Sequence, residues 1–243
     1  MKDRITKLKK RRAEKKKAAK KERRIESRLL ALQDTFVKPN NTPAEPIARR
    51  PDDVLQVKIE CLNTPYPAWR RVLLPGGISL DDFVHALIAA MGWDDEHKSS
   101  ITIGKTLYLA SGFGIFSSAD ILHINPNERD AWQYIAIDEL KKSKKITMLY
   151  DYGDSWEHKI TIEKILPEAR VQKDALFTCL DGAGACPPED CGGSDGIYRI
   201  VYLMENSDKN EDAYDKLMDW LGERFDKDKF SKDEVNRRLR RFA

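Results

Sequence analysis

The nine residues Tyr150-Asp-Tyr-Gly-Asp-Ser-Trp-Glu-His158 combine three aromatic rings, three carboxylates and a histidine around one glycine. On either side, residues 145–150 and 156–165 are rich in Ile, Thr, Tyr and Trp, which favour β-strands. Residues 151–155 supply the Asp, Gly and Ser that tight turns use. The stretch therefore predicts a β-hairpin whose turn is 151–155.

The second strand of this hairpin has two different faces. Its apolar set is Trp156, Ile160 and Ile162, and His158 falls on the same side, whereas the intervening positions are charged or carry a hydroxyl. Because a strand places alternate side chains on opposite faces, we expect Trp156 and His158 to lie in the core. Tyr152, in the turn, is then the aromatic residue that we expect to be exposed.

A second dense stretch, Cys179-Leu-Asp-Gly-Ala-Gly-Ala-Cys-Pro-Pro-Glu-Asp-Cys-Gly-Gly193, follows about twenty residues later. Its glycines and prolines interrupt both helical and strand periodicity, so we predict a structured loop over 179–196 and no regular element. We expect this loop and the hairpin turn to form one surface.

The rest of the body alternates between strand and helix patterns. Residues 55–61 and 68–74 predict two antiparallel strands, and 100–103 and 105–109 two more. From Ser79, an N-cap candidate, apolar residues recur with helical spacing as far as Met91, and Gly92 is a typical stop. Helical patterns follow at 197–205, 213–221 and 232–242. This order predicts an α+β fold with a single mixed or antiparallel sheet, roll-like and packed with helices.

Charge is unevenly distributed along the 243 residues. Residues 1–30 hold fifteen Lys and Arg against four acidic residues, a net charge of +11 inside a chain whose total is +3. We therefore predict three parts: a basic helical or disordered N-terminal arm (1–30), a Pro- and Asn-rich linker (31–53) and an α+β domain (54–243). The arm is a candidate for binding nucleic acid, and its clustered cations are Lys9, Lys10, Arg11, Arg12, Lys15, Lys16 and Lys17.

The composition excludes several classes of protein. No run approaches 18 apolar residues, so we expect no membrane-spanning helix. The charged N-terminus lacks the apolar core of a secretory signal. We therefore expect a cytoplasmic protein whose four cysteines are reduced thiols.

Five stretches resemble the plasmid pRiA4b ORF-3-like family, and together they cover about residues 53–240: Ala68–Val72, Met91–Trp93, Tyr150–His158, Ala185–Asp190 with Gly192–Gly193, and Phe230–Leu239. The resemblance implies a single α+β domain and no particular activity. Some members are carried as passengers of insertion elements, which implies a setting in mobile DNA. A resolvase label on some relatives has no recognisable catalytic serine context here.

Two metal sites are open on residue type alone. Zinc could be held by the imidazole of His158 and the thiolates of Cys179, Cys186 and Cys191. Only Cys186 and Cys191 have the short sequence separation of a zinc knuckle. Alternatively, five carboxylates could converge with His158 to hold magnesium, and these are Asp151, Asp154, Asp181, Glu189 and Asp190. The alternative for both sets is structural: small buried thiols, a core histidine, and carboxylates that accept hydrogen bonds in turns.

The same carboxylates, with Tyr152, form the candidate binding surface. We expect a non-enzymatic binding domain that interacts with nucleic acid or a protein partner in the context of mobile DNA. The alternative is a metal-dependent enzyme that acts on phosphate esters or nucleic acid. No cofactor is required by the first interpretation, whereas the second requires zinc or magnesium.

The basic arm generates the first prediction. Fluorescence anisotropy should detect binding of the full chain to duplex DNA, with an affinity that falls steeply as salt rises, since each neutralised phosphate contributes about −0.9 to the log–log slope. Deletion of residues 1–30 should abolish this binding. Undiminished binding by the truncated chain would contradict a role for the arm.

Overall fold

The computed structural model describes residues 53–111, 128–167, 171 and 175–243. All of them belong to one compact unit, Pro46–Ala243. The seven clustered cations of the N-terminal arm and most of the predicted linker lie outside the described residues.

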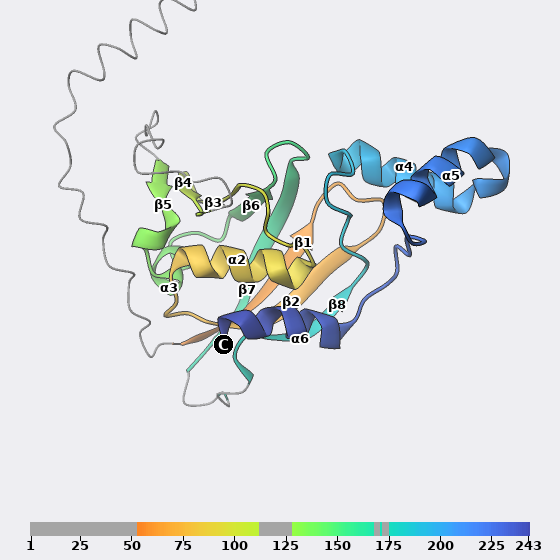
Figure 1. Cartoon of the computed structure of the whole chain (residues 1–243). Helices are drawn as coiled ribbons and strands as arrows, with labels where there is room; N and C mark the ends of the chain where they lie inside the picture. Colours follow the sequence, from red (N-terminus) through yellow and green to blue (C-terminus); the bar gives the residue numbers. More distant parts are fainter. Residues whose placement is uncertain (1–52, 112–127, 168–170, 172–174) are drawn as a thin grey trace, which may run out of the picture. The chain divides into compact units, whose positions relative to one another are not determined.

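One mixed sheet forms the centre of this unit (Figure 1). The order of its strands is β5-β4-β3-β6-β7-β1-β2-β8, and all neighbours are antiparallel except β4 and β5. The strands are β1 (Val54–Cys61), β2 (Ala68–Pro75), β3 (Ser99–Ile103), β4 (Thr106–Leu109), β5 (Glu128–Asp130), β6 (Ile146–Tyr150), β7 (Trp156–Leu166) and β8 (Thr178–Ala183). The predicted α+β class and the central hairpin, β6–β7, are confirmed.

The helices of the described residues are α2 (Leu80–Met91), α3 (Ala136–Leu140), α4 (Gly193–Glu205), α5 (Glu211–Leu221) and α6 (Lys232–Leu239). Short 3₁₀ turns occupy 131–133, 207–209 and 240–242. Helices α2 and α6 lie beside each other along the sheet (Figure 1). In the part of the chain that the structure describes, no helix is long and apolar enough to cross a membrane.

Helix α2 begins and ends as its sequence predicts. The Ser79 hydroxyl accepts the Asp82 amide proton at 2.9 Å, which satisfies one of the free N–H groups of the first turn. Gly92 ends the helix with φ 131° and donates its N–H to the Ile88 carbonyl at 3.2 Å. Both capping predictions are confirmed.

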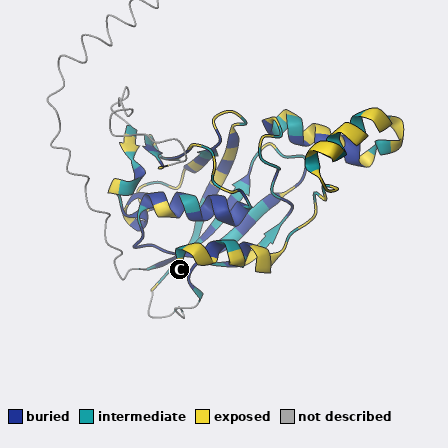
Figure 2. Cartoon of the chain, viewed as in Figure 1, coloured by how far each residue is buried: buried dark blue, intermediate teal, exposed yellow. Residues whose placement is uncertain are grey.

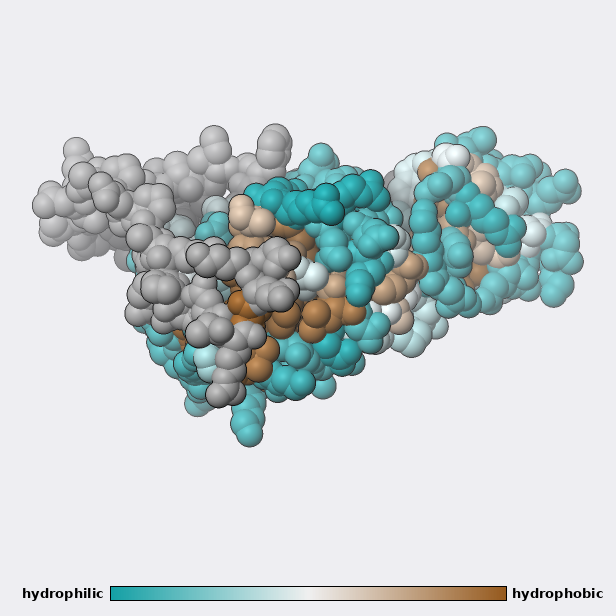
Figure 3. Space-filling view, turned by 90° about the horizontal axis from the view of Figure 1, so that it is seen from below, coloured by the Kyte–Doolittle hydropathy of each residue, from teal (hydrophilic) through white to brown (hydrophobic). Residues whose placement is uncertain are grey.

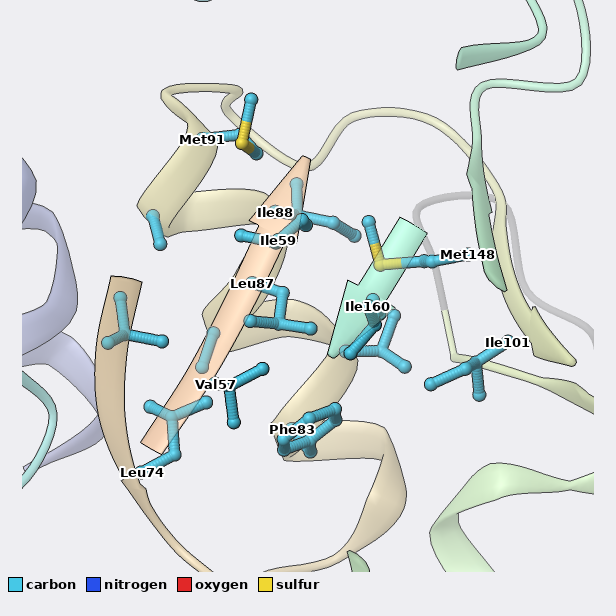
Figure 4. Packing of buried hydrophobic residues seen from close by; sticks show 14 of the residues in the cluster. Val57, Ile59, Leu74, Phe83, Leu87, Ile88, Met91, Ile101, Met148 and Ile160 are labelled. Carbon is cyan, nitrogen blue, oxygen red and sulfur yellow. The ribbon is translucent and has the colours of Figure 1, made fainter. Parts of the chain in front are cut away.

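The inner face of α2 supplies much of the core (Figure 4). Its side chains interdigitate with side chains of β1, β2, β3, β6 and β7. The labelled residues are Val57, Ile59, Leu74, Phe83, Leu87, Ile88, Met91, Ile101, Met148 and Ile160. Each fully buried side chain of this size contributes roughly 1.5–3 kcal/mol of gross hydrophobic stabilisation. The helix is therefore fixed against the sheet, and its C-terminal end has a defined position.

The opposite face of the sheet is polar. Arg71 forms an ion pair with Glu163 at 2.6 Å and a longer one with Asp181 at 3.3 Å, and Lys58 lies 4.9 Å from the centroid of the Trp69 ring. In Figure 2, buried residues concentrate in α2 and the strands, whereas α5 is mostly exposed. The hydrophobic surface visible in Figure 3 is bordered by hydrophilic residues.

The prediction of a loop over the whole of 179–196 was wrong at both ends. Residues 178–183 form β8, which pairs with β2, and α4 already begins at Gly193. Gly182 weakened the strand signal, because glycine is depleted in strands. The tertiary structure accounts for this glycine: a Cβ atom there would lie 2.6 Å from the Phe230 ring and 2.9 Å from the Trp69 carbonyl oxygen. Only the middle of the stretch, 184–192, is a loop.

Gly184 gives a prediction with a matched control. Gly184 and Gly222 both have left-handed backbones (φ 72° and 73°), but a Cβ at Gly184 would lie 2.0 Å from the Pro67 carbonyl oxygen, whereas one at Gly222 would meet nothing within 4 Å. Gly222→Ala should cost about 1–2 kcal/mol of unfolding free energy, the left-handed strain alone. Gly184→Ala should cost more than about 3 kcal/mol, because backbone must also move. Urea denaturation measures both, and equal losses would contradict the close approach.

Candidate functional site

The turn of the β6–β7 hairpin is built on Asp151. Its carboxylate Oδ1 accepts the Gly153 amide proton at 2.8 Å, and its carbonyl oxygen accepts that of Ser155 at 2.6 Å. Asp151 itself has φ 55°, a left-handed conformation that Asp tolerates better than most residues. Its own N–H donates to the Lys98 carbonyl at 2.9 Å, so the start of β3 lies directly beside the turn. His97 is thereby brought to the hairpin tip.

The loop at 184–192 is held against this turn from two sides. The Trp93 indole N–H donates to the Pro187 carbonyl at 3.0 Å. Oxygen Oε1 of Glu189 accepts two hydrogen bonds, from the Tyr150 hydroxyl at 2.8 Å and from the Asp94 amide at 3.3 Å. These contacts fix the Glu189 carboxylate at the hairpin.

A second pair of contacts joins the end of the loop to the turn. Asp154 Oδ2 accepts the Gly192 amide proton at 3.1 Å. At Gly193 a Cβ atom would lie 2.4 Å from the Asp154 carbonyl oxygen, so this approach needs glycine. The predicted single surface of turn and loop is confirmed, and Asp154 stabilises it.

His97 lies among three carboxylates on this surface. Its Nε2 is 3.4 Å from Asp190 Oδ1 and 3.8 Å from Glu189 Oε2, and its Nδ1 is 3.8 Å from Asp151 Oδ1. Single ligand atoms of His97, Asp151 and Asp190 all lie within 4.8 Å of one another. We call His97, Asp151, Glu189 and Asp190 the His97 cluster. Its Asp151 side chain is buried, whereas the Asp190 side chain is 75% exposed, so the cluster opens to solvent.

The spacing within the His97 cluster is too long for hydrogen bonds. Charge-assisted N–H···O bonds measure about 2.7–2.9 Å, and contacts near 3.6 Å no longer count as hydrogen bonds. By contrast, two ligands that bind a tetrahedral ion at about 2.1 Å lie about 3.4 Å apart. The pair of His97 Nε2 and Asp190 Oδ1, 3.4 Å apart, therefore has a spacing compatible with two ligands of one ion. Asp151 lies nearer the other ring nitrogen, Nδ1.

The electrostatics of the His97 cluster favour a cation. Burial raises the pKa of Glu189, while hydrogen bonds from Tyr150 and Asp94 act in the opposite direction. Its second oxygen, Oε2, is buried and has no hydrogen-bond partner. The neighbouring Asp151 charge raises the Glu189 pKa further. A positive charge placed here would relieve both the repulsion and the unsatisfied oxygen.

A second histidine cluster has the opposite character. His85 Nδ1 lies 2.6 Å from Asp95 Oδ2, and its Nε2 lies 3.6 Å from Asp81 Oδ1 and 3.3 Å from the Ser111 hydroxyl. Although burial opposes the charged form, the carboxylates of Asp81 and Asp95 raise the pKa of His85 to about 10. His85 is therefore an imidazolium at neutral pH, and the protein itself supplies its counter-charges.

This arrangement of Ser111, His85 and Asp95 has the connectivity of a hydrolase triad without its chemistry. A triad needs a neutral imidazole that can accept the proton of the serine hydroxyl. Here the imidazole is already protonated, and the Ser111 hydroxyl donates to Asp81. Ser111 N–H also donates to Asp81, at 2.7 Å. We assign the cluster a structural role.

The other predicted site residues are placed apart from the His97 cluster. His158 is completely buried, burial lowers its pKa to about 4, and its ring meets Trp93 edge-on at 5.2 Å. Cys179 lies in β8 opposite Val72, and Cys186 contacts the position of Gly92. Within the described residues, no three of the four proposed zinc ligands, which also include Cys191, come close enough to share an ion.

Two members of the predicted binding surface also lie outside the His97 cluster. Asp181 is on the polar face of the sheet, where it pairs with Arg71. Tyr152 is 45% exposed in the turn, as expected. His97, which belongs to the cluster, was missed because its segment is far from both dense stretches in sequence. The available signal was a histidine just before a strand that was expected to join the sheet.

Comparisons with known proteins agree with this fold. The family model described as plasmid pRiA4b ORF-3-like protein matches residues 53–234. The uncharacterised protein y4hQ of Sinorhizobium fredii (strain NBRC 101917 / NGR234) is 28% identical over 179 residues, which span 70% of this chain and 81% of the relative. The crystal structure of MM3350, a protein of unknown function from Methanosarcina mazei Go1, has a TM-score of 0.62 and 25% identity, over 76% of this chain and 98% of that one.

The raised pKa of His85 predicts how stability depends on pH. Above about pH 6.5 the unfolded chain loses the His85 proton, whereas the folded chain keeps it until about pH 10. The stabilisation is thus complete below pH 6.5 and is lost as pH rises towards 10, by at most about 4 kcal/mol between pH 6.5 and 9.5. Urea denaturation across this range should give a flatter profile for His85→Gln. Parallel profiles would contradict the imidazolium assignment.

Proposed function

The chain belongs to the plasmid pRiA4b ORF-3-like family. Because the two similar proteins are described as uncharacterised or of unknown function, we propose the function of this chain from its own site. It is a binding domain that holds a divalent metal ion in the His97 cluster. The observation that carries this proposal is that one ligand atom each from His97, Asp151 and Asp190 lie within 4.8 Å of one another. Such a grouping is compatible with atoms that share one ion.

The donor set favours a first-row transition metal. One imidazole nitrogen with carboxylate oxygens suits Zn²⁺ or Mn²⁺, whereas Ca²⁺ and Mg²⁺ prefer oxygen donors alone. Asp151 and Glu189 are already fixed by hydrogen bonds to the turn and to Tyr150, so they would bind the ion with little loss of side-chain freedom. Asp190 is exposed and free to close onto it.

The bound ion would leave coordination positions for a ligand. Three or four protein donors on the open side of the site do not enclose a metal, and an open position is the mark of a site that takes an external group. An anionic group on a partner, such as a phosphate of nucleic acid, would complete the coordination. This binding function is compatible with the basic arm, whose charge would bring nucleic acid to the domain.

Metal titration tests the proposal. Isothermal titration calorimetry should detect one equivalent of Zn²⁺ or Mn²⁺ per chain. His97→Gln and Asp190→Asn should each weaken binding by about tenfold or more, since each removes one donor. Asp181→Asn is the matched control, because this carboxylate lies on the polar face of the sheet with Arg71, and it should leave the affinity unchanged.

Two further results distinguish the proposed binding domain from its alternatives. If both cluster variants bind metal as tightly as the wild type, the site lies elsewhere and the proposal is wrong. Metal-loaded protein should also be assayed with bis(p-nitrophenyl) phosphate. Turnover that disappears in His97→Gln and Asp190→Asn would favour the enzymatic alternative, in which the ion activates water for hydrolysis of phosphate esters. Stoichiometric metal without turnover supports the binding domain.

A further inference from the structure

Arg70, in β2, carries a buried charge. The residue is only 3% exposed. Its guanidinium donates to the carbonyls of Trp69 at 2.8 Å, Ala183 at 2.9 Å and Met91 at 3.3 Å, while its Nε has no partner. The guanidinium carbon lies 4.9 Å from the centroid of the Phe230 ring. Four contacts with neutral groups thus hold a cation inside the protein.

No carboxylate of the described residues forms an ion pair with Arg70. The titratable groups that act on it are the thiols of Cys186, Cys179 and Cys61 and the phenol of Tyr66. Burial raises the pKa of Cys61 to about 12 and that of Cys186 well above its usual range, so these groups are neutral at physiological pH. A buried cation without a counter-charge is costly, and proteins normally pair it.

Arg70 lines a cavity of about 380 Å³ between the 185–189 loop and α6. Its lining combines apolar side chains, among them Trp93, Phe225, Phe230 and Val235, with nine charged side chains. A volume above about 300 Å³ is typical of a small-molecule site. The cavity therefore provides room for the missing counter-charge.

Of the other eight charged residues that line the cavity, four form two ion pairs. Arg238 forms an ion pair with Asp94 at 2.7 Å, and Lys229 lies 3.8 Å from Glu223. The remaining four are Glu189 of the His97 cluster, Asp226, Glu234 and Arg224, so they add mainly negative charge. A highly charged anion would meet these carboxylates, whereas one negative charge at Arg70 would not. The lining thus favours a ligand with a single negative charge, placed at Arg70, and with an apolar body that contacts the aromatic side chains.

We propose that this cavity binds a small organic carboxylate, with its carboxylate group against Arg70 and its apolar body between Trp93 and Phe230. The ligand supplies the counter-charge that the described residues lack. The site is separate from the metal site, although the two share the Glu189 wall. Binding therefore requires no metal ion.

Benzoate is a suitable probe, and benzamide is its neutral isostere. In the presence of EDTA, isothermal titration calorimetry should show benzoate binding at least about tenfold more tightly than benzamide, because only benzoate makes a charge-assisted contact with the guanidinium. Inorganic phosphate should bind more weakly than benzoate. In ¹⁵N–¹H spectra, benzoate should shift the Trp93 indole resonance.

Variants separate this proposal from the metal site. Arg70→Met should abolish the preference for benzoate over benzamide, and its stability without ligand should be measured alongside, because three carbonyls lose their guanidinium donor. Asp190→Asn should leave benzoate affinity unchanged while it weakens metal binding. Equal affinities of benzoate and benzamide in the wild type would overturn the proposal even if Arg70→Met failed to fold. So would tighter binding of phosphate, or spectral shifts that leave Trp93 unaffected.

Discussion

The packing of Trp93 is the interaction on which the rest of the site depends. Its ring lies 4.9 Å from that of Tyr150, 5.9 Å from that of Trp156 and 5.2 Å from that of His158, and its indole N–H reaches the Pro187 carbonyl. One completely buried side chain thus joins the end of α2, both strands of the hairpin and the 184–192 loop. Aromatic contacts of this kind add about 0.5–1.5 kcal/mol each to the burial of the ring. Without the packing of Trp93, the distance between Asp151 in the turn and Glu189 and Asp190 in the loop would not be fixed.

Within that frame, two histidines illustrate how distance decides role. His85 forms an ion pair with the Asp95 carboxylate at 2.6 Å, and the pKa of His85 is raised to about 10. His97 has three carboxylates, none closer than 3.4 Å. The first cluster has no need of an external group, whereas the second is unsatisfied in both charge and hydrogen bonding. Function is therefore assigned to the second cluster, even though the first has the connectivity of a triad.

Local periodicity was enough to predict the helix, the hairpin and the sheet class. Ser79, Gly92 and the apolar spacing between them specify α2, and alternation identifies the buried face of β7 around Trp156. Strand β8 was not predicted, because Gly182 is unfavourable in a strand by local propensity. The glycine is needed to leave space for the Phe230 ring, a tertiary contact that local sequence patterns do not show. Such conflicts between local propensity and packing are expected where distant segments approach closely.

The site was predictable only in part, for a related reason. Asp151, Glu189 and Asp190 stand out in dense polar stretches, but His97 joins them through the β3–β6 register, in which Ser99 lies opposite Tyr150. The zinc hypothesis relied on cysteines that are close in sequence. In the structure, Cys179 lies in strand β8 and His158 lies in the core, so they do not meet the other proposed ligands. Which metal-ligating side chains come together depends on how distant strands and loops pair, and residue types alone do not specify that pairing.

The cavity beside the His97 cluster extends this view of the 184–192 loop. Glu189 faces His97 on one side and lines the cavity that contains Arg70 on the other. The 184–192 loop thus lies between two neighbouring sites. The His97 cluster favours a cation, whereas the cavity with Arg70 favours an anion. Anomalous diffraction from crystals grown with Mn²⁺ or Zn²⁺ tests metal binding in the His97 cluster most directly. A bound ion should give a peak about 2.0–2.2 Å from a His97 ring nitrogen and from the Asp190 carboxylate. A map without such a peak, in which His97 instead hydrogen-bonds a carboxylate at about 2.8 Å, would contradict metal binding there.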